Sequence, residues 1–276
     1  MALSVREQQI LSEIKQWEQQ LFNYEPTDFG MTYDKWLGKS LQVIPDQIRK
    51  QFYAKLDSWL FHLHAFIQGS QAQIDARQRI LEAARMFKVE INELADLNNL
   101  TIDQLIYLTN QQMAKQRLYS FTQGGLTATG GILLLGIDIP AMAIINLRAI
   151  QLIAMTYGYE VNTPYEMMTS LKVFHAATLP KRMQQKGWES LLEELDEGSE
   201  QFFYEGSEEL TNDTWLEQPL KQVLKSLFIL LFRRKLIQGV PVIGMVIGAG
   251  MNYQLTRNVT EFAHKYYQLK YLSRSN

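Results

Sequence analysis

The chain has 276 residues, of which 46% are hydrophobic and 20% charged, and its formal net charge is −2. This balance allows a globular core and gives no overall positive field, so we expect no nucleic-acid partner. The sequence contains no cysteine, which excludes disulfides, thiolate metal sites and cysteine nucleophiles. The first residues lack the apolar core of a signal peptide, and the expected location is the cytoplasm.

Helix start signals are frequent in the first part of the chain, and strand signals are scarce. A capping box at residues 4–7 predicts a helix through about residue 22. Residues 24–38 are expected to form a loop, and a proline opens a predicted helix at 45–66. Residues 71–87 show apolar side chains at helical spacing. The pattern predicts an all-α fold, a multi-helix globular bundle.

The second part of the chain continues this pattern. A capping box at residues 101–104 predicts a helix to about Phe121. Asp138 is expected to cap a further helix that ends near Gly158, since glycine suits a C-terminal cap. Residues 163–166 combine a threonine cap, a proline at the first helical position and a glutamate, and they mark the clearest helix start.

Two apolar segments, residues 123–140 and 239–253, are rich in glycine. Glycine inside a helix costs about 1 kcal/mol relative to alanine, so its repeated use indicates close backbone approach. Their apolar runs, residues 125–137 and 236–251, are shorter than the roughly 18 apolar residues of a standard membrane span. Re-entrant or interfacial elements and a soluble core remain as alternatives. The candidate close-packing glycines are Gly130, Gly131, Gly136, Gly244, Gly248 and Gly250.

The charge pattern changes sharply between two neighbouring stretches. Residues 189–217 carry many carboxylates and no Lys or Arg, which predicts an acidic insertion that forms a mobile loop or a solvated helix. Residues 221–235 are basic and apolar, as in helices that bind anionic membranes. A buried core helix with snorkelling ends is the alternative. The candidate membrane or partner surface comprises Lys221, Lys225, Phe228, Phe232, Arg233, Arg234 and Lys235.

A few polar residues lie in otherwise apolar sequence, where an unpaired charge would be costly. This candidate polar cluster comprises Asp138, Asn146, Arg148, Gln151 and Asn252. One interpretation is a helix cap together with a buried structural ion pair. The other is a polar pocket between the two glycine segments that holds a lipid headgroup, a peptide or a small ligand.

Motifs for other chemistry are missing from the sequence. The glycine pairs follow no predicted strand and fit no nucleotide-binding motif. His62 and His64 do not converge on a helix, and no metal-ligand spacing occurs, so we expect no metal. No nucleophile motif of the GxSxG kind is present. We therefore assign no catalytic residue and expect no cofactor.

Several short motifs in the second half of the chain form a recognisable set. They are Gly130-Gly131, Asp138-Ile139-Pro140, Asn146-Leu147-Arg148, Ile153-Ala154, Tyr157-Gly158-Tyr159, Pro241-Val242-Ile243-Gly244, Gly248-Ala249-Gly250 and Asn252-Tyr253. With these motifs the chain resembles the EcsC family of bacterial proteins, named for a cistron that accompanies an ABC transporter. The resemblance covers residues 113–267 and leaves out the acidic stretch. It implies a helical protein linked to a transporter, secretion or membrane process, without an established reaction.

Together these observations predict an N-terminal helical region at 1–100 and an EcsC-like helical core at 101–276 with an acidic insertion at about 189–217. The leading hypothesis is a non-enzymatic accessory protein, peripheral to the inner face of the cell membrane through anionic lipid. An ABC transporter or another membrane protein is its expected partner. The alternative is a ligand-binding protein or hydrolase with its pocket at Asp138, Asn146, Arg148 and Asn252.

Overall fold

The computed structural model describes residues 3–24, 67, 69–127, 131–179, 181–196 and 241–274. Within these ranges, only the backbone is described at 125–127, 131–140, 182, 196, 241–248 and 251. Every element there is a helix, which confirms the predicted all-α class. The loop and helix predicted at 24–66, the surface at 221–235 and Gly130 lie outside the described residues, apart from Tyr24 at the edge of that loop.

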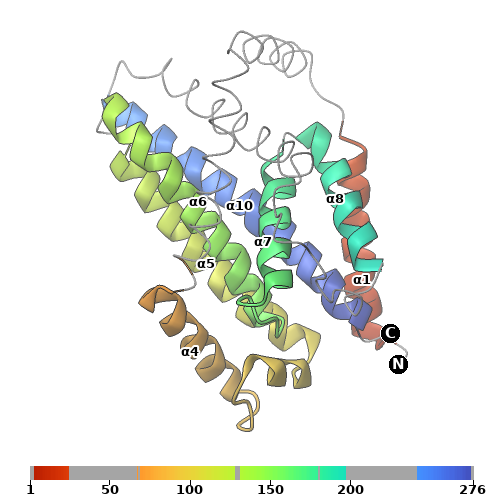
Figure 1. The fold of residues 1–276 in the computed structure, drawn as a ribbon. Coiled ribbons are helices and arrows are strands. Elements are labelled where there is room, and N and C mark those ends of the chain that lie inside the picture. Colours follow the sequence, from red (N-terminus) through yellow and green to blue (C-terminus); the bar gives the residue numbers. More distant parts are fainter. Residues whose placement is uncertain are drawn as a thin grey trace, which may run out of the picture.

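The described helices follow one another in chain order (Figure 1). They are α1 (Val5–Phe22), α4 (Gln71–Arg85), the short 3₁₀ helix η1 (Leu94–Asn99), α5 (Ile102–Thr127), α6 (Gly131–Thr156), α7 (Pro164–Thr178), α8 (Lys181–Asp196) and α10 (Pro241–Arg274).

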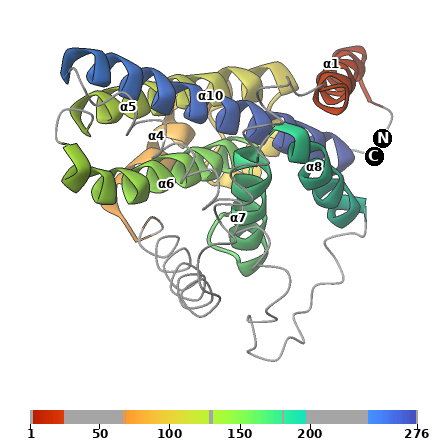
Figure 2. The ribbon, with the colours of Figure 1, turned by 90° about the horizontal axis from the view of Figure 1, so that it is seen from above.

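Three long helices, α5, α6 and α10, form the centre of the molecule and run alongside one another (Figure 2). The contact between α5 and α10 is the most extensive in the described structure. The C-terminal end of α5 and the N-terminal ends of α6 and α10 lie together at one end of this bundle, here called the glycine end. At the other end, here called the packed end, α7 and α8 surround the second half of α10 together with α1.

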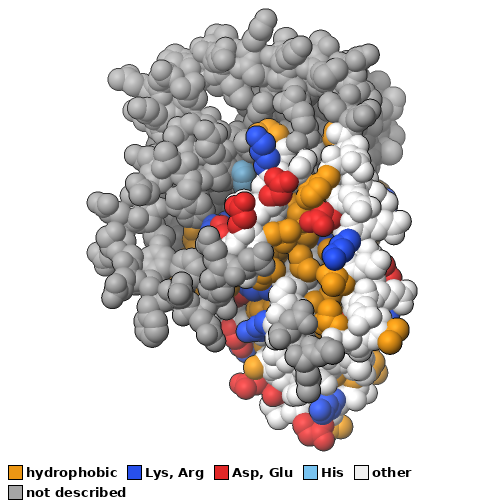
Figure 3. Space-filling model, turned by 90° about the vertical axis from the view of Figure 1, so that its right-hand side faces the viewer, with side chains coloured by type: hydrophobic (Ala, Val, Ile, Leu, Met, Phe, Trp, Pro, Cys, Tyr) orange, Lys and Arg blue, Asp and Glu red, His pale blue; other side chains and the backbone are white. Residues whose placement is uncertain are grey.

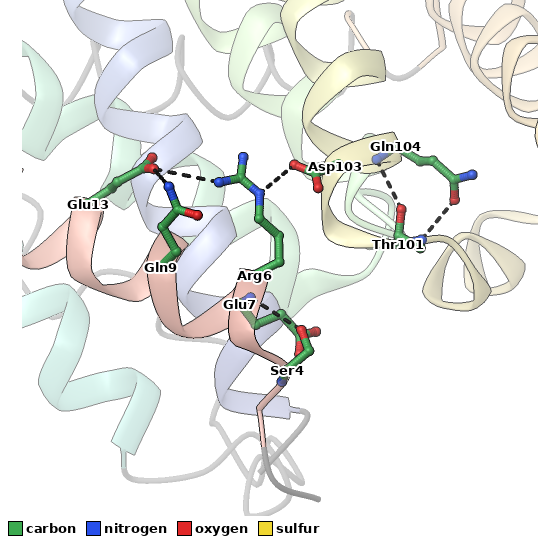
Figure 4. A network of polar contacts seen from close by, with 8 residues as sticks. All are labelled: Ser4, Arg6, Glu7, Gln9, Glu13, Thr101, Asp103 and Gln104. Carbon is green, nitrogen blue, oxygen red and sulfur yellow. Dashed lines mark hydrogen bonds and ion pairs between the residues drawn. The ribbon is translucent and has the colours of Figure 1, made fainter.

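The predicted helix starts are confirmed where local capping decides them. The Ser4 side chain accepts from the backbone of Glu7, and the Glu7 carboxylate accepts from the backbone of Ser4. Thr101 and Gln104 make the equivalent pair of contacts before α5. Figure 4 shows both caps, and between them Arg6 on α1 donates to a carboxylate on the first turn of α5 at 2.8 Å. Capping thus coincides with docking of α1 onto α5.

The prediction that a helix begins at Asp138 was wrong. Helix α6 runs without interruption from residue 131 to residue 156, so Asp138 and Pro140 lie in its interior. An interior proline costs about 3 kcal/mol relative to alanine. Because α6 packs along both α5 and α10, tertiary packing outweighs this cost and the local start signal is overridden.

The predicted C-terminal cap of α6 is confirmed at Gly158. This glycine has φ +80°, its N–H donates to the Met155 carbonyl at 3.0 Å, and Tyr159 N–H donates to the Ala154 carbonyl at 3.1 Å. These two bonds are those of a Schellman motif. A Cβ at this position would lie 3.0 Å from the Leu94 carbonyl oxygen, so both the dihedral and the close approach require glycine.

Aromatic side chains fill the core of the packed end. Trp188 on α8 is fully buried, and its ring packs edge to face against Trp17 at 5.0 Å and Phe262 at 5.3 Å between centroids. Its indole N–H donates to Glu18 Oε1 at 2.7 Å, which satisfies the buried donor. One tryptophan therefore joins three helices, α8, α1 and α10.

The first part of the predicted acidic insertion belongs to α8, which ends at residue 196. Leu191 is buried in the core, and Glu194 pairs with Lys172 on α7 at 2.5 Å. At residues 189–196 the acidic stretch is therefore a helix with one face packed on α7. Residues 197–217 lie outside the described part of the chain.

None of the helices that the structure describes has a stretch long and apolar enough to cross a bilayer.

Candidate functional site

The described members of the predicted polar cluster lie at more than one helix interface. Arg148 Nη2 donates to the carbonyl of Ala72 at 2.9 Å, and Gln151 Oε1 accepts from Gln73 Nε2 at 3.1 Å. Both contacts hold the first turn of α4 against α6. These contacts give Arg148 and Gln151 a structural role at the interface between α4 and α6.

The two asparagines of the predicted cluster are both buried, on different helices. Asn146 Nδ2 donates to the Met142 carbonyl of its own helix at 2.8 Å. Asn252 Nδ2 donates to Gln123 Oε1 on α5 at 3.4 Å. The side chain of Asp138 lies outside the described set. A single pocket formed by all five residues stays a prediction, and the described contacts place Asn252 in a different arrangement.

That arrangement is a row of polar side chains on α10, here called the polar seam. Its members recur at every fourth residue, so they form a stripe that winds gradually around the helix. All of them are buried. The seam comprises Asn252, Thr256, Thr260, His264 and Gln268.

In the half of the seam nearer the glycine end, α5 supplies the hydrogen-bond partners. Ser120 Oγ donates to the Asn252 carbonyl at 2.7 Å and accepts from Thr256 Oγ1 at 2.7 Å. One turn further, Arg117 Nε donates to Thr260 Oγ1 at 3.0 Å. Small hydroxyl side chains let two helices approach closely while their polar atoms stay satisfied. The most extensive interface between described helices is therefore polar at this end.

Nearer the packed end, the seam meets α6. His264 Nε2 and the Tyr157 hydroxyl are 2.9 Å apart, and the Thr109 and Thr156 hydroxyls on α5 and α6 are 2.7 Å apart. Burial lowers the pKa of His264 to about 3, and the charges of Lys265 and Arg117 act in the same direction. Burial also raises the pKa of Tyr157. His264 is thus a neutral, hydrogen-bonded core side chain at physiological pH.

The outward side of α5 has the opposite character. Leu118 is 61% exposed and Phe121 47% exposed, while Gln116 and Ser120 on the same helix are buried. Tyr253 on α10 extends this surface, with its ring 6.5 Å from that of Phe121. We call the exposed set the aromatic face; it comprises Leu118, Tyr119, Phe121 and Tyr253.

This second half of α5 therefore has an inverted pattern, with polar side chains inside and apolar side chains outside. In water the usual arrangement is the reverse, and a contiguous exposed apolar surface marks an interaction site. The charged side chains in this part of α5 are all positive: it carries Lys115 and Arg117, and no carboxylate follows Asp103. Residues 241–256 of α10 carry no charged side chain at all.

A buried ion pair lies at the packed end. Lys270 on α10 donates to Glu166 on α7, and its ammonium group lies 4.4 Å from the ring centroid of Tyr159 and 4.6 Å from that of Tyr165. Burial lowers the pKa of Lys270, and the nearby Glu166 carboxylate opposes this effect. Because the lysine is paired with Glu166 and lies beside aromatic rings, the arrangement ties α7 to α10.

The candidate close-packing glycines differ in what the structure says of them. The prediction that Gly250 is a close-packing glycine is corrected: Gly250 is exposed on α10, and a Cβ there would meet no described atom within 4 Å. Close approach occurs instead at Gly187, where a Cβ would lie 2.8 Å from that of Ala176 across the α7–α8 contact. For the others the described backbone is helical at residues 131, 136, 244 and 248, and their surroundings stay untested.

Sequence reasoning found Asn252 but missed the rest of the polar seam and the aromatic face. The four-residue recurrence from Asn252 to Gln268 is readable in the sequence and predicts a polar stripe that winds gradually around the helix. Its burial is not readable, because it depends on which neighbour covers that face. In the part of the chain that the structure describes, no three His, Asp or Glu side chains gather as a metal site.

These features define an all-α protein built on a three-helix bundle, with a buried polar interface and an exposed aromatic face at one end. A sequence profile of the EcsC protein family matches residues 8–272, and the chain belongs to this family. The match extends well beyond the 113–267 region in which the motifs are recognisable.

Among known relatives, the chain is similar to a protein of Bacillus subtilis (strain 168) described as "Uncharacterized protein YdbA". The two are 26% identical over 267 residues, which cover 92% of this chain and 88% of the relative. No solved structure matches the chain.

Proposed function

We propose that this protein is a non-enzymatic helical accessory protein that attaches peripherally to an anionic membrane surface. The observation that carries the proposal is the inverted pattern of α5, in which Gln116 and Ser120 are buried while Leu118 and Phe121 are exposed. The family resemblance adds the setting, a transporter- or secretion-linked process at the inner face of the cell membrane.

The shape of the aromatic face suits a helix that lies along a membrane. Tyr107, in the first half of α5, lies on the same side of the helix as Leu118 and Phe121, and a rise of 1.5 Å per residue places it about 21 Å from Phe121. Tyrosine and phenylalanine are favoured at the level of lipid headgroups. The neighbouring Lys115 and Arg117 each add about 1 kcal/mol of attraction to an anionic surface.

The basic apolar stretch at residues 221–235 fits the same proposal from the sequence side. It combines Lys and Arg with a run of large apolar residues, as membrane-surface helices do. It lies outside the described residues, so we treat it as a second predicted contact.

Flotation of the purified full-length protein with vesicles tests the proposal. We expect the wild type to float with vesicles that contain phosphatidylglycerol and to float less with neutral phosphatidylcholine vesicles or in high salt. The variant Leu118→Ser/Phe121→Ser should lose most of this binding. A matched control, Val5→Ser/Phe22→Ser, removes two exposed apolar side chains from α1 and should float like the wild type.

Two results would overturn the proposal. One is absence of flotation under every lipid and salt condition, and the other is equal flotation of the α5 variant and the wild type. The link to a transporter or secretion needs a separate measurement. Deletion of the gene should lower transport or secretion of a reporter protein, and unchanged transport would remove that part of the proposal.

A further inference from the structure

Two half-buried arginines lie near the aromatic face, one close enough to Tyr253 and the other close enough to Tyr119 to interact electrostatically, and each has a second arginine within electrostatic range. The first pair is Arg117 on α5 with Arg257 on α10, and the second is Arg148 on α6 with Arg79 on α4. In each pair one arginine is half-buried and the other is exposed. On α5, Arg117 and Tyr119 point about 100° to either side of Leu118. Arg117 therefore lies on one side of the aromatic face, and Tyr119, which interacts electrostatically with Arg148, lies on the other.

The side chain of Arg117 is anchored at Nε, and its two Nη groups make no hydrogen bond with a described residue. Its Nε donates to Thr260 Oγ1 at 3.0 Å, and that hydroxyl donates to the Arg257 carbonyl at 3.1 Å. Burial lowers the pKa of Arg117, Tyr253 and Glu261 oppose this, and the charge of Arg257 lowers it further. Among the described residues, no carboxylate lies within ion-pair distance of either arginine.

Arg148 is held in a comparable way on the other side. Its Nη2 donates to the Ala72 carbonyl at 2.9 Å. Burial lowers its pKa, nearby Tyr119 opposes this, and the charge of Arg79 lowers it further. Within the described part of the chain, Arg148 and Arg79 also have no carboxylate at ion-pair distance.

Other arginines of this molecule do have such partners. Arg6 pairs with Asp103 at 2.8 Å, and Arg77 on α4 pairs with Glu160 at 2.5 Å. A half-buried guanidinium group with a second positive charge nearby is unfavourable unless an anion neutralises it. A guanidinium group matches the geometry of phosphate oxygens with two parallel N–H bonds.

We propose that the two arginine pairs bind the phosphate groups of anionic phospholipids whose chains lie against the aromatic face. The inference rests on the proposed membrane function and names the lipid chemistry that the same surface recognises. The aromatic side chains between the pairs supply the apolar contact, and the arginines supply the selection for anionic headgroups.

The test changes only the two exposed arginines, so that folding is preserved. Arg79→Gln/Arg257→Gln should bind phosphatidylglycerol vesicles about 30-fold more weakly than the wild type, from two basic contacts at a membrane surface. The control Lys15→Gln/Lys186→Gln removes two exposed charges from α1 and α8 and should stay within about threefold of the wild type. Equal losses in both variants would overturn the proposal.

A second variant separates guanidinium recognition from simple charge. Arg79→Lys/Arg257→Lys keeps both charges but loses the planar fork. It should bind anionic vesicles at least fivefold more weakly than the wild type. Binding equal to that of the wild type would overturn a specific phosphate contact.

Calorimetric titration with short-chain, soluble phosphatidylglycerol gives a readout that does not depend on a membrane. We expect heat of binding in the wild type, none in Arg79→Gln/Arg257→Gln, and none for inorganic phosphate with either protein. Vesicle binding that needs Leu118 and Phe121 but is unchanged in the arginine variants would overturn the phosphate site and leave the proposed function standing. Absence of both vesicle binding and soluble-lipid binding would overturn both.

Discussion

The two ends of the α5–α10 pair are built on opposite principles. At the packed end, Trp188, Tyr266 and Tyr267 are buried, and the Glu166–Lys270 pair lies among aromatic rings. On the side of the molecule where α1 and α8 lie, acidic and basic side chains are both exposed around a band of hydrophobic ones (Figure 3). At the glycine end, Ser120 and Thr256 are buried, and aromatic side chains are outside.

This difference within one helix pair indicates that its two ends are suited to different surroundings. The packed end follows the rule for a protein in water, with large apolar side chains removed from solvent. At the other end hydrogen bonds hold the helices together and apolar side chains are left outside, as in helices that pack within lipid. The contrast supports the proposal that the glycine end and the outer face of α5 meet a membrane surface.

The largest expected effect comes from removing the aromatic core of the packed end. Trp188→Ala leaves a cavity beside Trp17 and Phe262 and should lower the free energy of unfolding by about 4 kcal/mol. By contrast, Leu118→Ala, on the aromatic face, should change it by no more than about 0.5 kcal/mol. Urea denaturation measures both. Similar losses in the two variants would contradict the distinction between the ends.

A smaller effect is expected from the buried ion pair. Lys270→Met leaves the Glu166 carboxylate buried without its partner and should cost about 3 kcal/mol of folding stability. The double variant Glu166→Gln/Lys270→Met removes both charges and should recover most of that loss. Denaturation at pH 7 measures the pair, and a double variant as unstable as the single one would argue against charge burial as the cause.

The neutral histidine in the polar seam gives an expected pH dependence. The pKa of His264 is lowered to about 3 in the folded protein, against about 6.5 unfolded, so the unfolded state binds the extra proton as the pH falls. Stability is complete above pH 6.5 and is lost as the pH falls toward 3, by about 2 kcal/mol at pH 5. His264→Gln should make the stability less sensitive to pH in this window. An unchanged pH profile in the variant would place the titrating group elsewhere.

Several parts of the fold were predictable because they depend on neighbours in sequence. The caps at Ser4 and Thr163 and the glycine stop at Gly158 are fixed by contacts within a few residues. Asp138 and Pro140 also resemble a local start signal, and there the prediction was wrong because α6 is held by two other helices. Local signals hold where no tertiary contact opposes them.

The functional surface was harder to predict, for the same physical reason. Residues 116, 118, 120 and 121 of α5 alternate polar and apolar character, and the sequence does not say which set faces α10. Arg148 was predicted from its apolar surroundings, but its hydrogen bond to the Ala72 carbonyl and the electrostatic effect of Arg79 depend on how α4 docks on α6. Inversion becomes visible only when burial is known for each side chain.

The smallest expected effect concerns the glycines at the two ends. Gly250→Ala adds a methyl group to an exposed helix position where it meets no described atom within 4 Å, and it should stabilise the protein by about 0.5–1 kcal/mol. Gly187→Ala brings a methyl group to 2.8 Å from the Ala176 Cβ between α7 and α8 and should destabilise the protein instead. Thermal unfolding of the two variants measures these opposite signs. A loss of stability at Gly250 would mean that this part of α10 is held against a neighbour after all, and the exposed aromatic face beside it would then be smaller than the structure describes.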